Sequence, residues 1–317
     1  MRDTSELDFR PSLLGRAWDP EETKRALDEL FYVARIYNRS DEYIGLLDFV
    51  AKFRFYSPFN AMLIHIQMPG AVYVAPASRW MAQWHRAVKP GERPLVLLRP
   101  MGPVMFVFDV SQTVPLDDEC PLPEEVVNPF VIRQGWVGNQ LELTIENAKR
   151  DGVRVVEQGA GSQWAGAIRP AVDPRPLDVT VRQRQGQKVQ FVPARYEILL
   201  NSGFGREETY ATLVHELGHL YCGHLGTPDP SWWPDRSFLG KLEREFEAES
   251  VSFLVCSRLG IVTPSARYLA RYLERHQEIP PISLDRVLAA AGLIEDMGRG
   301  LLKPREKPEG ARTVPRR

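Results

Sequence analysis

Apolar residues recur at helical spacing along much of this chain, and short segments rich in proline or glycine separate the helical stretches. The first such stretch, residues 20–38, is amphipathic and predicts a helix. A second helix is expected from Ser40, which suits the N-cap position, to about Tyr56. A third follows directly and ends at Pro69-Gly70. The chain is therefore expected to begin with a run of helices.

Shorter apolar runs then replace the helical pattern. Residues 71–76 predict a short strand, residues 78–86 a helix, and the runs LVLLRP and VMFVFDV two further strands. Residues 1–113 are therefore expected to form a small helical and β module, and the whole chain to belong to the α+β class. Prolines and two acidic clusters indicate an interdomain linker over residues 114–137.

A second module is expected over residues 138–300. It begins with a helix near 138–151, and strands follow around VRVVEQ, AGAIRP, KVQFV and YEILLNS. Four more helices are predicted at about 205–224, 239–259, 264–277 and 283–297. Residues 301–317 are basic and contain prolines, which predicts a disordered tail.

Composition narrows the function classes. The chain is 44% hydrophobic and 26% charged with a net charge of −1, so any binding to nucleic acid or membrane must come from a local patch. Three cysteines without a CxxC pair favour a reducing compartment. The sequence shows no secretory signal and no apolar run of bilayer length. We therefore expect a soluble cytoplasmic protein that does not bind membranes.

The chemistry of the second module centres on TLVHELGHLYCGH, residues 212–224. His215 and His219 are four residues apart on a predicted helix, so both imidazoles lie on one face and can reach one zinc ion. Glu216 is rotated by about 100° from His215, which makes it unsuitable as a ligand but suitable as a general base. A chance match of this short pattern is the alternative.

A third metal ligand is needed to complete such a site. His224 is one residue away from the position at which a metzincin carries its third histidine. The next predicted helix supplies several glutamates, of which Glu245 and Glu249 share a face with small residues. We choose Glu245 as the ligand, with Glu249 as the alternative or as the partner of a ligating histidine. Glu243 and Glu247 are expected to face solvent.

The order of these motifs resembles the ImmA/IrrE-like zinc metallopeptidases, whose second motif is E-x-E-A-N-x-F-A. That motif stands here as EFEAESVS, and the first glutamate of the family, a zinc ligand, falls on Glu245. Glu249, Val251 and Ser252 depart from the pattern, and glutamate at the asparagine position is closer to the ArdC branch. The resemblance implies a zincin-like, gluzincin-type domain that hydrolyses peptide bonds.

The N-terminal half is similar to the ArdC-like antirestriction domain, over residues 56–100 and the FDVSQT that follows. That family joins a module for single-stranded DNA to a zinc peptidase domain. The resemblance therefore implies single-stranded DNA as a partner and a role in antirestriction, DNA transfer or stress. Cations that track phosphates and aromatic rings that stack on bases give the expected contacts Arg79, Trp80, Trp84, Arg86, Lys89 and Arg93. The resemblance to the family adds Tyr56 and Asn60 as expected contacts.

Several alternatives stay open. Trp80 and Trp84 share one helix face, which suits a hydrophobic core as well as a stacking surface. The zinc could be structural in a DNA-binding protein, or the chain could be an ImmA-like protease that cleaves a repressor without binding DNA. Tyr221, His224 and Tyr268 are candidates for stabilising an oxyanion. YEILLNS is the expected edge strand for a protein substrate that the sequence does not identify.

Overall fold

The structure, a computed structural model, describes residues 39–99, 102–117, 122, 126, 136–160, 164–173, 175–183 and 186–305. Within these residues the fold is mixed α+β, with eight α-helices and several small sheets. Each of these helices is too short or too polar to cross a lipid bilayer. The predicted helix at 20–38, most of the predicted linker, and the tail beyond residue 305 lie outside the described part.

Contacts divide the chain into two compact units. Unit 1 consists of Met1–Tyr37 and Asn60–Val131, and unit 2 of Asn38–Phe59 and Ile132–Arg317. Helix α2 (Ser40–Lys52) lies within the predicted module 1–113 but belongs to unit 2. The hydroxyl of Tyr43 in α2 donates to Ser250 at 2.9 Å, and its ring packs on Phe246.

Unit 1 is built on a three-stranded antiparallel sheet in which β4 (Gly102–Asp109) lies between β1 (Val74–Ala75) and β3 (Leu95–Arg99). Strands β2 (Arg86–Val88) and β5 (Thr113–Pro115) form a separate antiparallel pair. Trp80 is fully buried beside Tyr73 and Phe108, and its indole N–H donates to the Phe108 carbonyl at 2.8 Å. Besides these five strands, unit 1 contains most of α3 (Pro58–Gln67), helix α4 (Ala77–Trp84) and the 3-10 helix η2 (Val110–Gln112).

Unit 2 contains a second three-stranded sheet of order β6-β10-β7. Its central strand β10 (Tyr196–Asn201) is parallel to β6 (Val153–Gln158) and antiparallel to β7 (Gly166–Pro170). The prediction that residues 196–202 form an edge strand is therefore wrong. Five of the six β10 residues are buried, the pattern of a strand that is paired on both edges and covered on both faces.

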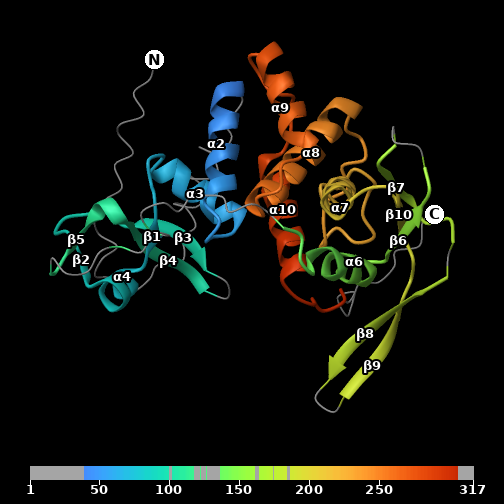
Figure 1. Cartoon of the computed structure of the whole chain (residues 1–317), viewed down its shortest axis with the longest axis horizontal. Helices are drawn as coiled ribbons and strands as arrows, with labels where there is room; N and C mark the ends of the chain where they lie inside the picture. The colour runs from blue at the N-terminus through green and yellow to red at the C-terminus, as the bar shows by residue number, and fades with distance from the viewer. Residues whose placement is uncertain are drawn as a thin grey trace, which may run out of the picture. The chain divides into compact units, whose positions relative to one another are not determined.

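The helices of unit 2 pack around α8, which contacts α2, α7, α9 and α10. Figure 1 shows α7 end-on, with α8 beside it and α6 below it. The bounds of these helices are α6 Gln140–Arg150, α7 Arg206–Tyr221, α8 Lys241–Arg258, α9 Pro264–Arg275 and α10 Leu284–Arg299. All five lie where helical spacing predicts them, with ends shifted by a few residues.

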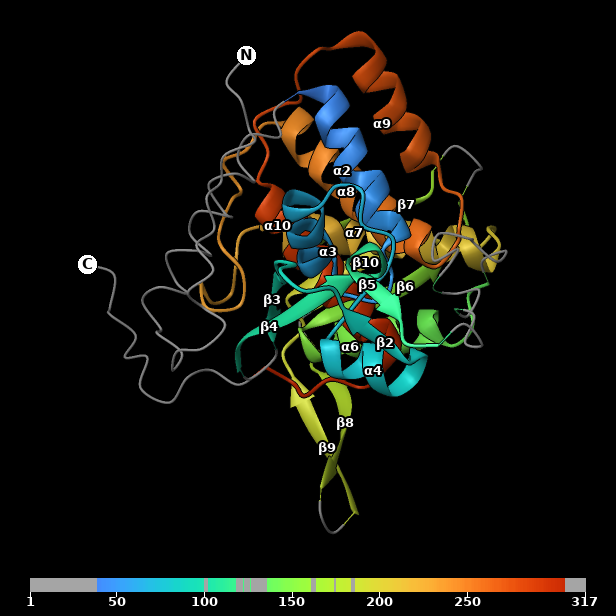
Figure 2. The same ribbon diagram turned by 90° about the vertical axis from the view of Figure 1, so that its left-hand side faces the viewer.

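The segment 170–195, in which the sequence predicts a strand around KVQFV, contains an antiparallel hairpin of β8 (Leu177–Gln183) and β9 (Gly186–Val192). The hairpin projects from the rest of unit 2 in both views (Figures 1 and 2). Arg150 of α6 donates to the Thr180 carbonyl at 2.8 Å and so fixes the hairpin to the helix.

Arg258, at the end of α8, joins three parts of unit 2. Its guanidinium donates to the carbonyl oxygens of Val50 at 2.6 Å, Phe53 at 3.0 Å and Tyr56 at 2.5 Å. It also pairs with the buried carboxylate of Glu295 in α10. Removing such a guanidinium leaves a charge and several carbonyls buried without their partner.

Arg258→Leu is expected to lower the free energy of unfolding of unit 2 by about 3–5 kcal/mol, the usual cost of breaking a buried ion pair from one side. Urea unfolding followed by circular dichroism measures this change. Arg299→Leu is the matched control, because Arg299 pairs with the same carboxylate at 3.2 Å but has a side chain 60% exposed. Its expected cost is within about 1 kcal/mol. Equal losses in the two variants would contradict the role of Arg258.

Candidate metal centre

Helix α7 presents two histidines on one face. His215 and His219 are one turn apart, and their ring centroids are separated by 4.9 Å. Around the two histidines the apolar side chains of the helix are fully buried, which fixes its rotation about its own axis. These buried residues are Leu213, Val214, Leu217 and Leu220.

The neighbouring helix α8 brings Glu245 to the histidines because the two helices cross closely at Gly218. A Cβ atom on Gly218 would lie 3.3 Å from Ala248 Cα and 3.3 Å from Val251 Cβ. A larger side chain at 218 would therefore push the helices apart. Ala248 is one turn after Glu245, so the crossing sets the distance between the Glu245 carboxylate and α7.

Three ligand atoms converge at this crossing. A carboxylate oxygen of Glu245 lies 3.7 Å from His215 Nε2 and 3.8 Å from His219 Nε2, and the ligand atoms all lie within 4.8 Å of one another. Nitrogen and oxygen ligands at ~2.0–2.1 Å from a tetrahedral zinc ion are about 3.3 Å apart. Small shifts therefore bring these donors to zinc-binding distances, and the donor set fits zinc.

The electrostatic environment keeps both imidazoles neutral. Burial lowers the pKa of His215, and burial together with the neighbouring His215 and His224 lowers the pKa of His219 to about 2. A neutral imidazole has a free lone pair, which is the form that binds a metal. The side chain of Glu245 is 36% exposed, so one side of the cluster is open to solvent.

Glu216 lies on α7 between the two histidines. Its side chain is buried, and the backbone of Ile168 in β7 hydrogen-bonds its carboxylate. Burial raises the pKa of Glu216 to about 7, and the carboxylates of Glu245 and Glu249 add to the rise. A carboxyl group with a pKa near neutrality is suited to accepting and returning a proton. The strand beside it is β7, whereas the sequence pointed to β10.

Glu249 lies on the other side of His215. Its carboxylate oxygen is 3.8 Å from His215 Nδ1, and it hydrogen-bonds Ser265 of α9. It thus approaches the ring nitrogen that does not face Glu245. This position suits the partner of a ligating histidine, which is one of the two roles predicted for Glu249.

Glu247 is expected from the sequence to face solvent, and that prediction is wrong. Its side chain is fully buried and accepts two hydrogen bonds from Arg236 at 2.6 Å and one from the Ser283 backbone N–H at 2.7 Å. Burial raises its pKa, but hydrogen bonds from His224 and Arg236 outweigh that effect and lower it. Arg236 lies in the loop between α7 and α8, where the sequence has no helical periodicity from which its pairing with Glu247 could be predicted.

The structure separates the three candidates for stabilising an oxyanion. Tyr221 is buried and donates to Asp151 at 2.9 Å. His224 is buried between His219 and Glu247. Tyr268 of α9 is half-buried, and burial raises its pKa together with the nearby carboxylates of Glu249 and Glu245. Tyr268 is thus the candidate that is both accessible and adjacent to the cluster.

Two of the predicted DNA contacts belong to the interior of unit 1. Trp80 is fully buried with its N–H bonded to Phe108, so the predicted base-stacking role is wrong for this residue. The amide of Asn60 is buried and holds both backbone groups of Leu98 in β3, each at 2.9 Å. Asn60 therefore fixes α3 to the sheet and is not available for a ligand.

Three other predicted DNA contacts make hydrogen bonds within the protein. Arg86 donates to the side chain and carbonyl of Thr113 at 2.8 and 3.0 Å, and Lys89 donates to the Ser111 carbonyl at 2.6 Å. The backbone of Tyr56 accepts a hydrogen bond from Arg258. These contacts explain the positions of the three residues without a ligand.

The remaining predicted contacts lie at the surface. Arg79 is exposed and its guanidinium carbon lies 5.6 Å from the centroid of the Trp84 ring, a cation–π arrangement. Trp84 itself is half-buried, and Arg93 is exposed. The structure thus leaves a smaller set of candidate contacts than the sequence predicts.

No protein-family model matches the chain. An uncharacterized protein of Bacillus anthracis is 22% identical over an alignment of 305 positions that covers 82% of this chain and 48% of that protein. The chain therefore spans about half the length of this curated relative.

Among solved structures, a metal-free crystal structure of the antirestriction ArdC protein from plasmid R388 has a TM-score of 0.35 and 16% identity. It covers 78% of this chain, and the match includes 87% of that protein. This neighbour bears the name suggested by the sequence motifs, but similarity at this level does not establish a shared fold. Fusion to an ImmA/IrrE-like peptidase domain stays a prediction.

Glu245→Ala is expected to weaken zinc binding by more than about 100-fold, beyond the 10–100-fold typical of residues that only support a ligand. Competition with a chromophoric chelator measures the affinity, and the wild type is expected to bind one zinc ion at this centre. Glu243→Ala removes the same charge one half-turn earlier on α8 and should leave the affinity unchanged. Equal affinities of the two variants would contradict the assignment of Glu245.

Proposed function

We propose that unit 2 is a zinc-dependent metallopeptidase whose metal is held by His215, His219 and Glu245. The observation that supports this most is the convergence of the three ligand atoms within 4.8 Å of one another. A site with three protein donors and a side open to solvent favours catalysis over a purely structural role. Glu216 beside the cluster favours it too, since a structural site has no use for a base.

Zinc bound by such donors acidifies water and polarises a substrate carbonyl. In the proposed reaction, the carboxylate of Glu216 accepts the proton of the attacking water and returns it to the leaving amine of the peptide. The backbone of Ile168 holds that carboxylate in place. We assign the phenol of Tyr268 to the oxyanion that develops on the substrate.

The sheet of unit 2 offers a place for the substrate chain. Strand β7 is at one end of the order β6-β10-β7 and pairs only with β10 within the described residues. An extended peptide can add to such an edge through backbone hydrogen bonds. Since Ile168 of β7 also contacts Glu216, a peptide on this edge lies next to the base.

Glu216→Gln is expected to keep its zinc and to lose about 10²–10⁴-fold in the rate of peptide cleavage, the usual contribution of a general base. A peptide library incubated with zinc-loaded protein and analysed by mass spectrometry gives the rate and the cleavage sites. Tyr268→Phe should retain zinc and cleave more slowly. If zinc-loaded wild type cleaves no faster than Glu216→Gln, the zinc is structural.

A second part of the proposal concerns single-stranded DNA. Arg79 over the half-buried Trp84, with Arg93 exposed in the same unit, supports a small surface for phosphates and one base. An antirestriction role is the one that the resemblance to ArdC implies. The buried Trp80 instead favours the rival, a regulatory protease that cleaves a protein without binding DNA.

Arg79→Ala combined with Arg93→Ala distinguishes the two. If both cations contact phosphates, the slope of log affinity against log salt should fall by about 1.4, at about 0.7 for each contact with a single strand. Fluorescence anisotropy of a labelled oligonucleotide measures it. Arg271→Ala with Arg275→Ala removes the same charge from exposed positions of α9 and is the control. Equal salt slopes in the wild type and both double variants would favour the rival.

A further inference from the structure

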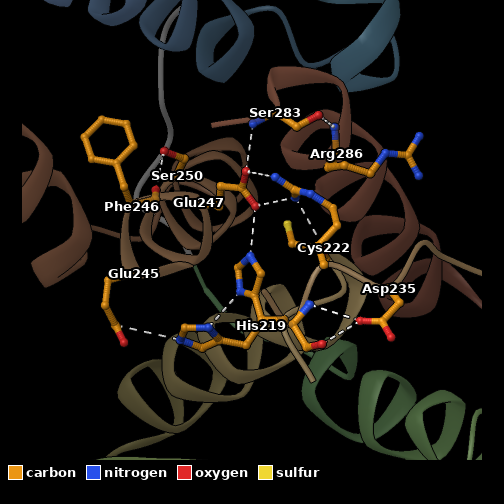
Figure 3. A network of polar contacts seen from close by, with 12 residues as sticks. His219, Cys222, Asp235, Glu245, Phe246, Glu247, Ser250, Ser283 and Arg286 are labelled. Atoms are coloured by element: carbon orange, nitrogen blue, oxygen red, sulfur yellow. Dashed lines mark hydrogen bonds and ion pairs between the residues drawn. The ribbon is translucent and has the colours of Figure 1, made fainter. Parts of the chain in front are cut away.

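A second group of ligand-type side chains lies behind the metal centre. Cys222, His224 and Glu247 are all buried, and their donor atoms lie within 4.8 Å of one another. Glu247, however, already accepts four hydrogen bonds, two from Arg236 and one each from His224 and the Ser283 N–H. Figure 3 shows Glu247 within this network, with its contact to Ser283. Four bonds fill the acceptor positions of a carboxylate. Burial also raises the pKa of the Cys222 thiol well above its ordinary value, which keeps it protonated. The group is therefore a hydrogen-bonded network and not a second metal site.

The direction of each hydrogen bond in the network follows from one ion pair. Arg236 binds both oxygens of Glu247 at 2.6 Å, a bidentate pair that keeps Glu247 ionised and therefore only an acceptor. His224 Nε2 lies 2.8 Å from a Glu247 oxygen, so this nitrogen must carry the hydrogen.

The hydrogen position on His224 also determines that on the proposed ligand His219. The tautomer of His224 with its hydrogen on Nε2 has a lone pair on Nδ1, which lies 3.0 Å from His219 Nδ1. His219 must then carry its hydrogen on Nδ1 and donate it to His224. This leaves the lone pair of His219 on Nε2, the nitrogen that lies 3.8 Å from the Glu245 carboxylate.

The loop after α7 is built to bring His224 back to His219. Gly223 has φ +86°, and a Cβ atom there would lie 2.1 Å from the Pro234 carbonyl oxygen, so the position requires glycine. The His224 N–H bonds the His219 carbonyl at 3.0 Å and the Gly223 N–H bonds the Leu220 carbonyl at 2.9 Å, a helix-ending turn of the Schellman type.

We propose that His224, Glu247 and Arg236 are positioning residues that fix the tautomer and the ring orientation of His219 for zinc. The inference rests on the proposed zinc site and adds three residues outside the ligand set. Carboxylate–histidine–metal arrangements orient a ligand and raise its basicity. Here a second histidine is inserted between the ligand and the carboxylate, which lets a glutamate anchored by a loop arginine act on His219.

The direct test is the position of the hydrogens in the metal-free protein. Long-range ¹H–¹⁵N correlation spectra of histidine-labelled full-length protein report which ring nitrogen is protonated. The chain is expected to show His219 protonated on Nδ1 and His224 on Nε2. A hydrogen on His219 Nε2, or on both nitrogens of His224, would overturn the proposal.

Zinc affinity is the second readout. Glu247→Gln, which replaces an obligatory acceptor by a group that can also donate, is expected to weaken zinc binding about 10–100-fold in chelator competition. His224→Leu should weaken it similarly, and His224→Gln should recover part of the loss because its carbonyl oxygen can accept from His219 Nδ1.

Glu295→Gln is the matched control, because Glu295 is also a buried carboxylate paired with an arginine. It is expected to destabilise the fold without changing the zinc affinity, and circular dichroism checks that each variant is folded. A wild type that binds no zinc would refute the proposed function itself. A wild type that binds zinc, with Glu247→Gln of equal affinity, would refute only the positioning role.

Discussion

The close crossing of α7 and α8 is the constraint on which the candidate site depends. Two residues without bulky side chains, Gly218 and Ala248, meet there, and a Cβ on Gly218 would already lie 3.3 Å from its neighbours. At that distance Glu245 reaches the lone pairs of two histidines from another helix. The fully buried apolar side chains of both helices near the crossing hold it in place, which a metal site with fixed ligand distances requires.

The same two helices also supply what stands behind the ligands. His215 has Glu249 near its second ring nitrogen, and His219 has the chain through His224 to Glu247. In each case the supporting carboxylate on α8 is held by a group from another element, Ser265 of α9 for Glu249 and Arg236 of the loop before α8 for Glu247. The site is thus a small polar network placed between apolar helix faces.

The spacing of residues along the predicted helices is sufficient to predict part of the site. The spans of α7 and α8, the shared face of His215 and His219, and the choice of Glu245 all follow from residues three and four apart. Spacing within one helix cannot say which of its faces is inside. The sequence therefore places Glu247 wrongly and leaves Trp80 open between core and surface, because their burial depends on Arg236 and on the Phe108 carbonyl, groups that are not on their own helices. The central place of β10 depends likewise on pairing with β6 and β7.

The central claim is that zinc binds to two imidazoles and one carboxylate, with the remaining position open. X-ray absorption at the zinc edge of the one-to-one complex tests it most directly, since sulfur at ~2.3 Å is readily distinguished from nitrogen and oxygen at ~2.0–2.2 Å. We expect four nitrogen or oxygen ligands, two of them from imidazoles, and no sulfur ligand. A sulfur ligand, or four protein ligands, would place the metal with Cys222 or in a closed structural site and would contradict it.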